Sequence, residues 1–128
     1  MVNREIKLRP YNQHTGEMYE PMTIEQISRI RNPANISPVS VDLIMYFDSI
    51  IWSPFTRLRD RNYKEIYEDD VIVWFSPLGE REKMLVYYRN GAVYFKRFET
   101  EKQYDWAGVD TTEIEVIGNI HEQPELLN

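Results

Sequence analysis

The dipeptide Asn90-Gly91 is the sequence feature that most constrains the fold of this chain. It separates two runs rich in β-branched and aromatic residues, 84–88 and 92–98. Both central residues of a type I′ turn need a positive φ, and Asn-Gly is a favoured pair at those positions. The two runs are therefore predicted to form an antiparallel hairpin.

Further short strands are predicted on both sides of this hairpin. Apolar and charged residues alternate over Arg4–Arg9, which indicates a half-buried strand, and a short return strand is expected through Met18 and Tyr19. Residues 71–75 and 114–120 are β-branched enough for two more strands. Six or seven short strands without βαβ units favour a closed or nearly closed barrel or roll.

One short helix is predicted before the middle of the chain. Thr23 and Gln26 have the spacing of a capping box, and isoleucines follow every three residues. Residues 32–40 are expected to form a loop with two prolines. Residues 41–52 are expected to form a strand, although Leu43 and Met45 leave a helix open.

Composition excludes several classes of protein. The 128 residues include no cysteine and carry a formal net charge of −6. A disulfide scaffold, a thiol nucleophile and cysteine-ligated zinc are therefore excluded. The chain starts without an apolar signal-peptide core, and its most apolar window, 43–52, is interrupted by Asp48 and too short to span a bilayer. We expect a cytoplasmic protein without a membrane partner.

Charge changes sign in the middle of the chain. Residues 1–64 hold 9 Lys/Arg and 7 Asp/Glu, whereas residues 65–128 hold 6 and 14. The alternating arginines before this boundary share one face if the segment is extended. On such a face arginines can contact phosphates, and a nearby aromatic ring can stack on bases. A solvated, ion-paired loop is the interpretation that the sequence favours for this segment, and an acidic protein partner is a further alternative. The residues predicted to bind a partner are Arg57, Arg59, Arg61, Tyr63 and Lys64.

The sequence offers little for catalysis. The acidic corner Glu65–Asp70 lacks the spacing and the glycine of an EF-hand. His14 and His121 lie more than 100 positions apart, and neither a nucleophile motif nor a phosphate-binding glycine loop is present. We therefore predict no catalytic, metal-binding or cofactor-binding residue, no cofactor, and no enzyme activity.

Aromatic residues are abundant, with nine Tyr, five Phe and three Trp. Trp52, Trp74 and Phe75 are expected to fill the core of the barrel. Tyr87 and Tyr88 are adjacent in a predicted strand, so at least one of them faces outward. Exposed tyrosine is common at protein interfaces, and self-association through such a surface is one hypothesis.

Three segments together carry a family resemblance. They are Arg4–Arg9, Phe55–Val71 and Glu115–Leu127, and the last is the most specific. In this order they resemble the YopX-like family of phage and prophage proteins over nearly the whole chain. The resemblance implies a mainly β fold with a small SH3-type barrel, in one domain 1–128 with a hairpin over 1–22, a variable helix and loop over 23–48, and the barrel core over 49–128. It implies no activity and no catalytic residue.

The chain departs from the pattern of that family at Pro10-Tyr11, where Ala-Trp is usual, and at three positions of the central segment. Arg57, Tyr63 and Asp69 stand where glycines are usual. Glycine at a tight turn commonly supplies a positive φ. Asp69 tolerates that region better than most residues, whereas the loop around Tyr63 is expected to be the most altered.

These observations predict a phage- or prophage-encoded accessory protein that acts by binding or assembly, with an unknown protein partner or with itself as a homo-oligomer. The alternative is a small-barrel nucleic-acid-binding protein using Arg57, Arg59 and Arg61, which the net charge disfavours. A metal-dependent nuclease is the third hypothesis.

Overall fold

The computed structural model describes residues 6–30, 32, 34, 37–89, 92–98, 103–105 and 110–127. The chain divides into two compact units, Met1–Phe55 and Thr56–Asn128. The boundary lies inside one long strand, and each unit is described by itself. Among the residues that the structure describes, no helix is long and apolar enough to cross a membrane.

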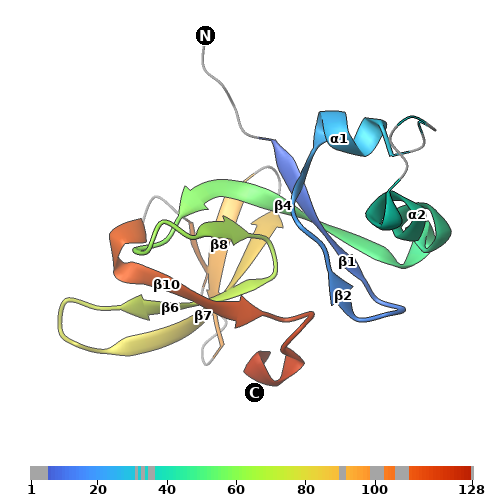
Figure 1. Cartoon of the computed structure of the whole chain (residues 1–128). Helices are drawn as coiled ribbons and strands as arrows, with labels where there is room; N and C mark the ends of the chain where they lie inside the picture. Colours follow the sequence, from blue (N-terminus) through green and yellow to red (C-terminus); the bar gives the residue numbers. More distant parts are fainter. Residues whose placement is uncertain are drawn as a thin grey trace, which may run out of the picture. The chain divides into compact units, whose positions relative to one another are not determined.

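The first unit is built on a small antiparallel sheet with strand β1 at its centre (Figure 1). One edge of β1 pairs with β4, from Leu8 opposite Pro54 to Asn12 opposite Ile50. The other edge pairs with the two-residue strands β2 and β3, which confirms the predicted return strand at Met18, although β2 ends there and does not include Tyr19. The elements are β1 (Lys7–Asn12), β2 (Glu17–Met18), β3 (Met22–Thr23), α1 (Ile24–Ser28), α2 (Pro38–Met45), η2 (Phe47–Ser49) and β4 (Ile50–Arg59), whose last residues belong to the second unit.

Helix α1 begins as predicted, with Thr23 as its N-cap and a reciprocal capping box to Gln26. The strand expected over residues 41–52 is wrong before Ile50, because residues 38–45 form helix α2. Ser37 caps this helix in a second capping box with Ser40, and Pro38 occupies its first turn. Both are start signals for a helix, and they outweigh the β-branched residues that follow.

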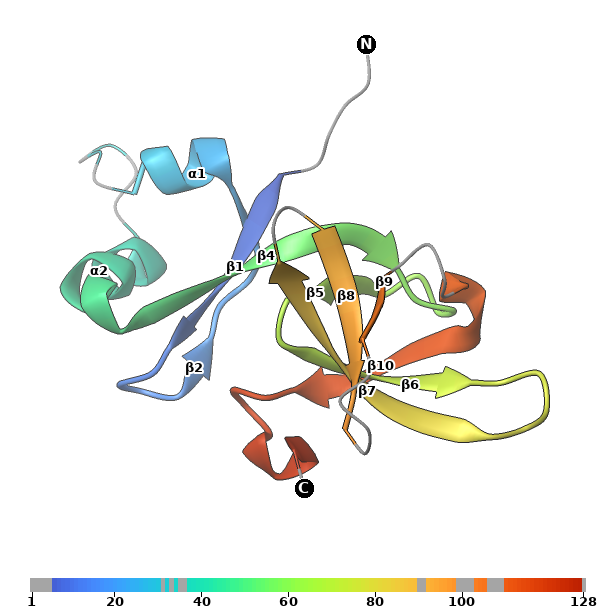
Figure 2. The ribbon, with the colours of Figure 1, turned by 180° about the vertical axis from the view of Figure 1, so that it is seen from behind.

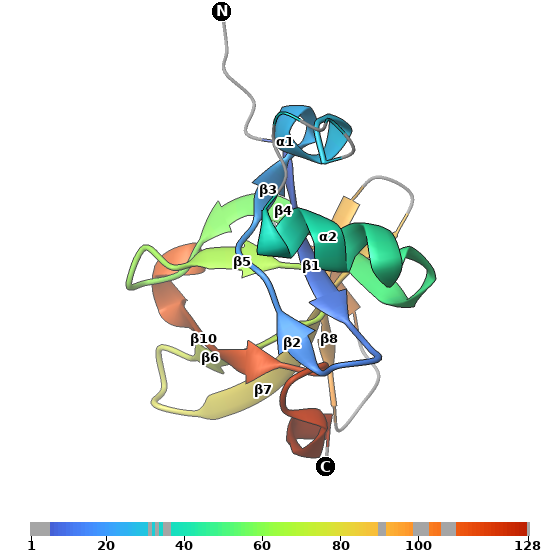
Figure 3. The ribbon, with the colours of Figure 1, turned by 45° about the vertical axis from the view of Figure 1, so that its right-hand side comes forward.

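Helix α2 is held against the sheet by a small apolar core. Leu43 is fully buried. It packs in one cluster with three other buried residues, Ile50 of β4, Ile30 after α1 and Tyr19 after β2. Figure 3 shows α2 lying across β1 and β4. The Tyr19 hydroxyl also lies 3.2 Å from the Asp42 carboxylate, so the only charged residue of α2 is directed at the sheet.

The second unit is dominated by a five-stranded antiparallel sheet in the order β10-β6-β7-β8-β9, while β5 pairs with β4. Pairing of Arg89 with Ala92 confirms the hairpin predicted from Asn90-Gly91, whose turn residues themselves lie outside the described residues. Trp106, which the sequence indicates as a candidate for burial in the polar loop after this hairpin, also lies outside the described residues. The elements are β5 (Glu65–Tyr67), β6 (Asp70–Phe75), β7 (Arg81–Arg89), β8 (Ala92–Arg97), β9 (Gln103–Asp105), η4 (Thr111–Glu113), β10 (Ile114–Asn119) and η5 (Pro124–Leu127).

Alternation along these strands separates a buried face from an outer face. The even-numbered residues of β7 face inward, so Met84 and Val86 are buried, and Tyr88 packs against the same core. The odd-numbered residues face outward, where Tyr87 stacks on Tyr94 of β8 with 5.6 Å between ring centroids. The buried cluster comprises Ile66, Ile72, Met84, Val86, Val93, Phe95, Ile114 and Val116.

Among the residues that the structure describes, three other than glycine have a positive φ, and they are the three central positions at which the resemblance led us to expect glycine. Arg57, Tyr63 and Asp69 have φ values of 67°, 63° and 71°. Left-handed backbone is disfavoured for residues with a Cβ. Each of the three therefore has a backbone conformation that glycine adopts more easily, Arg57 within β4, Tyr63 in the β4–β5 turn and Asp69 in the β5–β6 turn.

The mainly β fold class is confirmed by these two antiparallel sheets and their short helices. The description of the second unit as an SH3-type barrel stays a prediction.

Candidate functional site

The basic residues predicted from the sequence have different neighbours in the structure. Arg59 pairs with Glu65 across β4 and β5, with 3.4 Å between Nη2 and Oε2. Arg61 lies over the ring of Phe75, 4.8 Å from its centroid. Burial raises the pKa of Tyr88, and the Arg57 guanidinium nearby opposes that rise. All five predicted side chains are exposed, namely Arg57, Arg59, Arg61, Tyr63 and Lys64.

Asp60 fixes the turn that presents this segment. Its buried carboxylate accepts the backbone amides of Asn62 and Lys64 through Oδ1, at 2.8 and 2.9 Å. Through Oδ2 it accepts the amide of Val116 in β10 at 2.9 Å. Hydrogen bonds to a charged acceptor are roughly twice as strong as neutral ones. One carboxylate therefore joins the β4–β5 turn to β10.

The acidic corner is tied down by local contacts. Asp70 is buried and accepts the amide of Tyr67 at 2.8 Å. The imidazole of His121 lies 2.8 Å from the Asp69 carboxylate, which joins the β5–β6 turn to the segment after β10. Burial raises the pKa of the Glu68 carboxyl, and the neighbouring Asp69 charge raises it further. Within the described ranges, no group of three His, Cys, Asp or Glu is arranged to hold a metal ion.

The two histidines have separate surroundings. His14 lies in the first unit and stacks on Tyr46 with 5.1 Å between ring centroids. His121 lies in the second unit beside Asp69. Each imidazole therefore contacts a side chain of its own unit.

Cations and aromatic rings gather on the outer face of the β6–β7 hairpin. Phe75 was expected in the core but lies on this face, opposite Arg81 in the sheet register. The guanidinium groups of Arg61 and Arg81 lie 4.8 and 5.3 Å from the centroid of its ring. Lys83 lies 4.8 Å from the centroid of Phe98. We call the set Arg61, Phe75, Arg81, Lys83 and Phe98 the cation–ring face.

The sheet register explains why these residues share a face. Residues opposite each other in an antiparallel pair project to the same side, and Val73 lies opposite Lys83 on one strand and Glu115 on the other. Glu115 therefore adds one carboxylate beside the three cations. The hairpin extends beyond β8, because β7 first pairs with β8 at Met84 (Figure 2).

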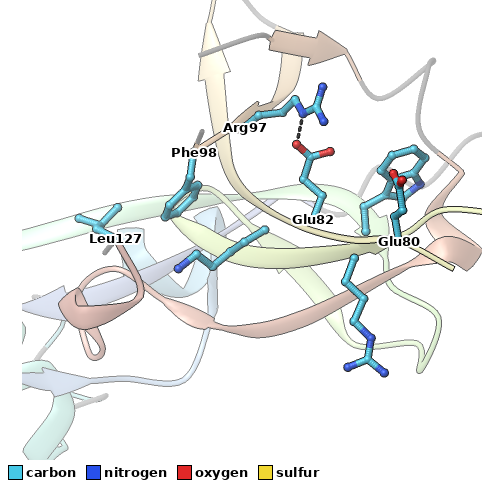
Figure 4. Close-up of a pocket in the computed structure, with 8 residues that line it drawn as sticks. Glu80, Glu82, Arg97, Phe98 and Leu127 are labelled. Carbon is cyan, nitrogen blue, oxygen red and sulfur yellow. Dashed lines mark hydrogen bonds and ion pairs between the residues drawn. The ribbon is translucent and has the colours of Figure 1, made fainter. Parts of the chain in front are cut away.

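A pocket of about 620 Å³ adjoins the cation–ring face. Figure 4 shows Phe98 and Leu127 at one side of the pocket, Glu80 at the other, and Glu82 directed at Arg97. Arg97 and Glu82 form an ion pair between β8 and β7. The pocket is lined by Trp74, Glu80, Arg81, Glu82, Lys83, Arg97, Phe98 and Leu127. A pocket with aromatic walls and both charges suits a flat polar ligand better than an aliphatic one.

Sequence reasoning missed most of the cation–ring face. Only Arg61 was among the predicted binding residues. The available signal was the alternation of Arg81 and Lys83 in a strand opposite Phe75, but it appears only once the β6–β7 register is known.

A second exposed surface lies on helix α2. Val41, Ile44 and Met45 are 41%, 42% and 68% exposed, and their spacing of three and four residues places them on one side of the helix. Asp42, the charged residue of the helix, is directed at Tyr19 instead. We call Val41, Ile44 and Met45 the α2 face, and it is apolar and uncharged.

The described surfaces define a β-rich protein with two candidate binding surfaces, one charged and aromatic and one apolar. The sequence model of the YopX family, described as YopX protein, matches residues 7–128. The chain therefore belongs to the YopX family, as the resemblance predicted.

Solved structures support the same fold. The crystal structure of protein EF1440 from Enterococcus faecalis is similar to this chain with a TM-score of 0.60 and 22% sequence identity. The similarity covers 96% of this chain and 98% of that one, and it concerns the fold alone. No curated protein was found to match the sequence.

Proposed function

We propose that this protein is a phage- or prophage-encoded accessory protein of the host cytoplasm that works by binding and assembly, not by catalysis. Membership of the YopX family supports the accessory role. The observation that carries the proposal is the α2 face, where three adjacent apolar side chains are more than 40% exposed. Exposed apolar clusters of this kind mark protein interaction sites.

The occupant proposed for the α2 face is a second copy of the same chain. Two copies related by a twofold axis present the same patch to each other. In such a dimer a charged patch would be repelled by the like charge of the same patch on the other copy. The α2 face carries no charge, so this repulsion does not arise. Phe47 and Val39, each more than 40% exposed, lie next to it in the chain and extend the apolar area that a dimer buries.

Light scattering over a wide range of protein concentration tests this proposal. We expect the wild-type mass to rise toward that of a dimer, and Met45→Lys to keep the protein monomeric, because the dimer would bury the new charge without a partner. Leu78→Lys is the matched control. Leu78 is 88% exposed in the β6–β7 turn, outside the α2 face, so the same change there leaves assembly unaltered.

The results separate assembly from other outcomes. A wild-type protein that stays monomeric at every concentration overturns self-association through the α2 face. Equal loss of assembly in Met45→Lys and Leu78→Lys places the contact elsewhere. Turnover of a substrate that disappears with a substitution in the pocket of about 620 Å³ contradicts the non-catalytic role.

The metal-dependent nuclease hypothesis has less support. The acidic corner on which it depends uses Asp70 to hold the Tyr67 amide and Asp69 to contact His121. Thermal unfolding with and without millimolar Mg²⁺, Mn²⁺ or Ca²⁺ tests it, because a bound ion stabilises the folded state. A raised melting temperature together with nuclease activity would revive that hypothesis.

A further inference from the structure

We propose that the cation–ring face and its adjoining pocket bind single-stranded nucleic acid. Phosphates contact Arg61, Arg81 and Lys83, and an unpaired base enters the pocket beside Phe98. This inference rests on the proposed function, in that it assumes a protein that binds without catalysis. It moves the nucleic-acid hypothesis from the predicted segment 57–64 to the outer face of β6 and β7.

The first support is the arrangement of cations in the sheet. Arg81 and Lys83 are two residues apart in an extended strand, so both project outward and their Cα atoms are about 6.8 Å apart. Arg61 reaches the same ring as Arg81 from the segment after β4. Glu115 is the one carboxylate that the register places in the same rows. Three positive charges therefore outnumber one negative charge on this face, while in the adjoining pocket Glu82 is paired with Arg97 and Glu80 adds one more carboxylate.

The second support is the pairing of each cation with an aromatic ring. Guanidinium groups that lie over a ring are held flat, and a base stacks on such a plane or on the ring itself. Phe75 and Phe98 are both half-buried, so their rings are fixed by the fold and still reach solvent. An acidic peptide needs only the cations, whereas a nucleic acid uses the cations and the rings together.

The third support is the pocket. Its volume of about 620 Å³ lies within the range of small-ligand sites and accommodates one nucleotide. Phe98 and Leu127 provide apolar walls on one side, and Glu80 provides an acceptor for the N–H groups on the edges of unpaired bases, including N3–H of thymine. Duplex DNA keeps its bases stacked inside, so only a single strand supplies a base to this pocket.

The net charge of the chain sets the expected strength. A formal charge of −6 repels phosphates at long range, so binding is expected to be weak and confined to low salt. For single strands, the logarithm of the binding constant falls with the logarithm of salt by about 0.7 per phosphate neutralised. Three cations therefore predict a slope of about −2.

Fluorescence anisotropy with labelled oligo(dT) of about 12 nucleotides tests the proposal, a length within the range that small barrels cover. We expect salt-dependent binding by the wild-type protein and weak binding of a duplex of the same length. The variant Arg81→Gln/Lys83→Gln is expected to lower the salt slope by about 1.4. Phe98→Ala is expected to weaken binding at least about fivefold with the slope unchanged, because stacking is lost and charge is kept.

The matched control is Arg57→Gln/Arg59→Gln, which removes the same charge from the segment predicted by sequence. Thermal unfolding of all variants checks that they fold. Equal weakening by the two double variants, or a larger effect of the control pair, overturns the assignment to the cation–ring face. Equal binding of single strands and duplex does the same.

Two further outcomes separate this inference from the proposed function. Displacement of oligo(dT) by polyglutamate at an equal concentration of charges indicates an acidic protein partner and overturns the nucleic-acid assignment. Absence of oligo(dT) binding at low salt, together with concentration-dependent dimerisation that Met45→Lys abolishes, overturns this inference and leaves the proposed function supported.

Discussion

Replacing Tyr63 by glycine is expected to stabilise the protein. Tyr63 has a φ of 63°, and a Cβ in this region costs about 1–2 kcal/mol. Glycine removes that cost. It also lowers the free energy of unfolding by about 0.4–1 kcal/mol, because a glycine gives the unfolded chain more conformations. The side chain is 85% exposed, so its removal sacrifices little buried surface. The net gain in the free energy of unfolding is about 0.8 kcal/mol.

Urea and thermal unfolding of Tyr63→Gly, Tyr63→Ala and the wild type measure this effect. A gain of this size corresponds to roughly 3 °C in melting temperature for a chain of this length. Tyr63→Ala removes the same ring but keeps the Cβ, so it should show little or no gain. If Tyr63→Ala is as stable as Tyr63→Gly, the left-handed backbone is not the source of the strain, and the reasoning from φ is refuted.

Three further predictions concern buried or crowded positions of the second unit. Asp60→Ala leaves three backbone amides without their acceptor and should lower the free energy of unfolding by about 2–4 kcal/mol, measured by urea titration. An unchanged urea midpoint would contradict the role of Asp60 in joining the β4–β5 turn to β10. The pKa of Glu68 is higher in the folded state than its ordinary value of 4.5, so the folded state binds the proton of this carboxyl more tightly than the unfolded state does. Protonated Glu68 therefore stabilises the fold fully at a pH below 4.5, and this stabilisation is lost as the pH rises through the pKa of the folded state. Glu68→Gln should therefore melt higher than the wild type at neutral pH and equally at acidic pH, and a constant difference across pH would argue against the pKa shift. Gly118→Ala places a Cβ against Gln123 Oε1, its nearest neighbour, and 2.8 Å from Leu126 Cδ1. This crowding should loosen η5 and speed hydrogen exchange of the Leu126 amide, whereas unchanged exchange would show that the Gln123 and Leu126 side chains move aside without disturbing η5.

Local signals in the sequence predicted the elements that depend on neighbouring residues. The capping box at Thr23 and Gln26 predicted the start of α1, and Asn90-Gly91 predicted the pairing of β7 with β8. Alternation predicted that one of Tyr87 and Tyr88 faces outward, and Tyr87 does. In each case the physical cause acts within a few residues of chain.

Elements that depend on distant contacts were harder to predict. Residues 41–45 have β-branched side chains, but the capping box at Ser37 and the burial of Leu43 against Ile50 favour a helix. Phe75 is the last residue of the predicted strand 71–75, and its large ring suggested the core, yet its position opposite Arg81 in the sheet places it on the outer face. Register is set by pairing between strands, and a shift of one residue exchanges the two faces.

Part of the candidate site was predictable and part was not. Arg57, Arg59 and Arg61 are exposed as predicted, but they do not alternate along one strand, because Arg57 has a positive φ of 67° and Arg61 lies in the turn after β4 ends at Arg59. The neighbours of these arginines could not be predicted from the sequence. Arg61 contacts Phe75 and Arg59 pairs with Glu65 only once β4, β5 and β6 are assembled. A sequence shows which cations are exposed, but the fold decides which ring or carboxylate each one meets.

Strand β4 has a consequence for how this chain can be divided or inherited. Its residues up to Pro54 pair with β1, while Thr56 just beyond the unit boundary donates its hydroxyl to the carbonyl of Ile66 at 2.7 Å. A cut or a recombination breakpoint at Phe55 therefore falls inside a paired strand and not in a linker. Each fragment would carry a truncated strand and an open sheet edge, which promotes aggregation. Limited proteolysis is accordingly expected to spare this boundary.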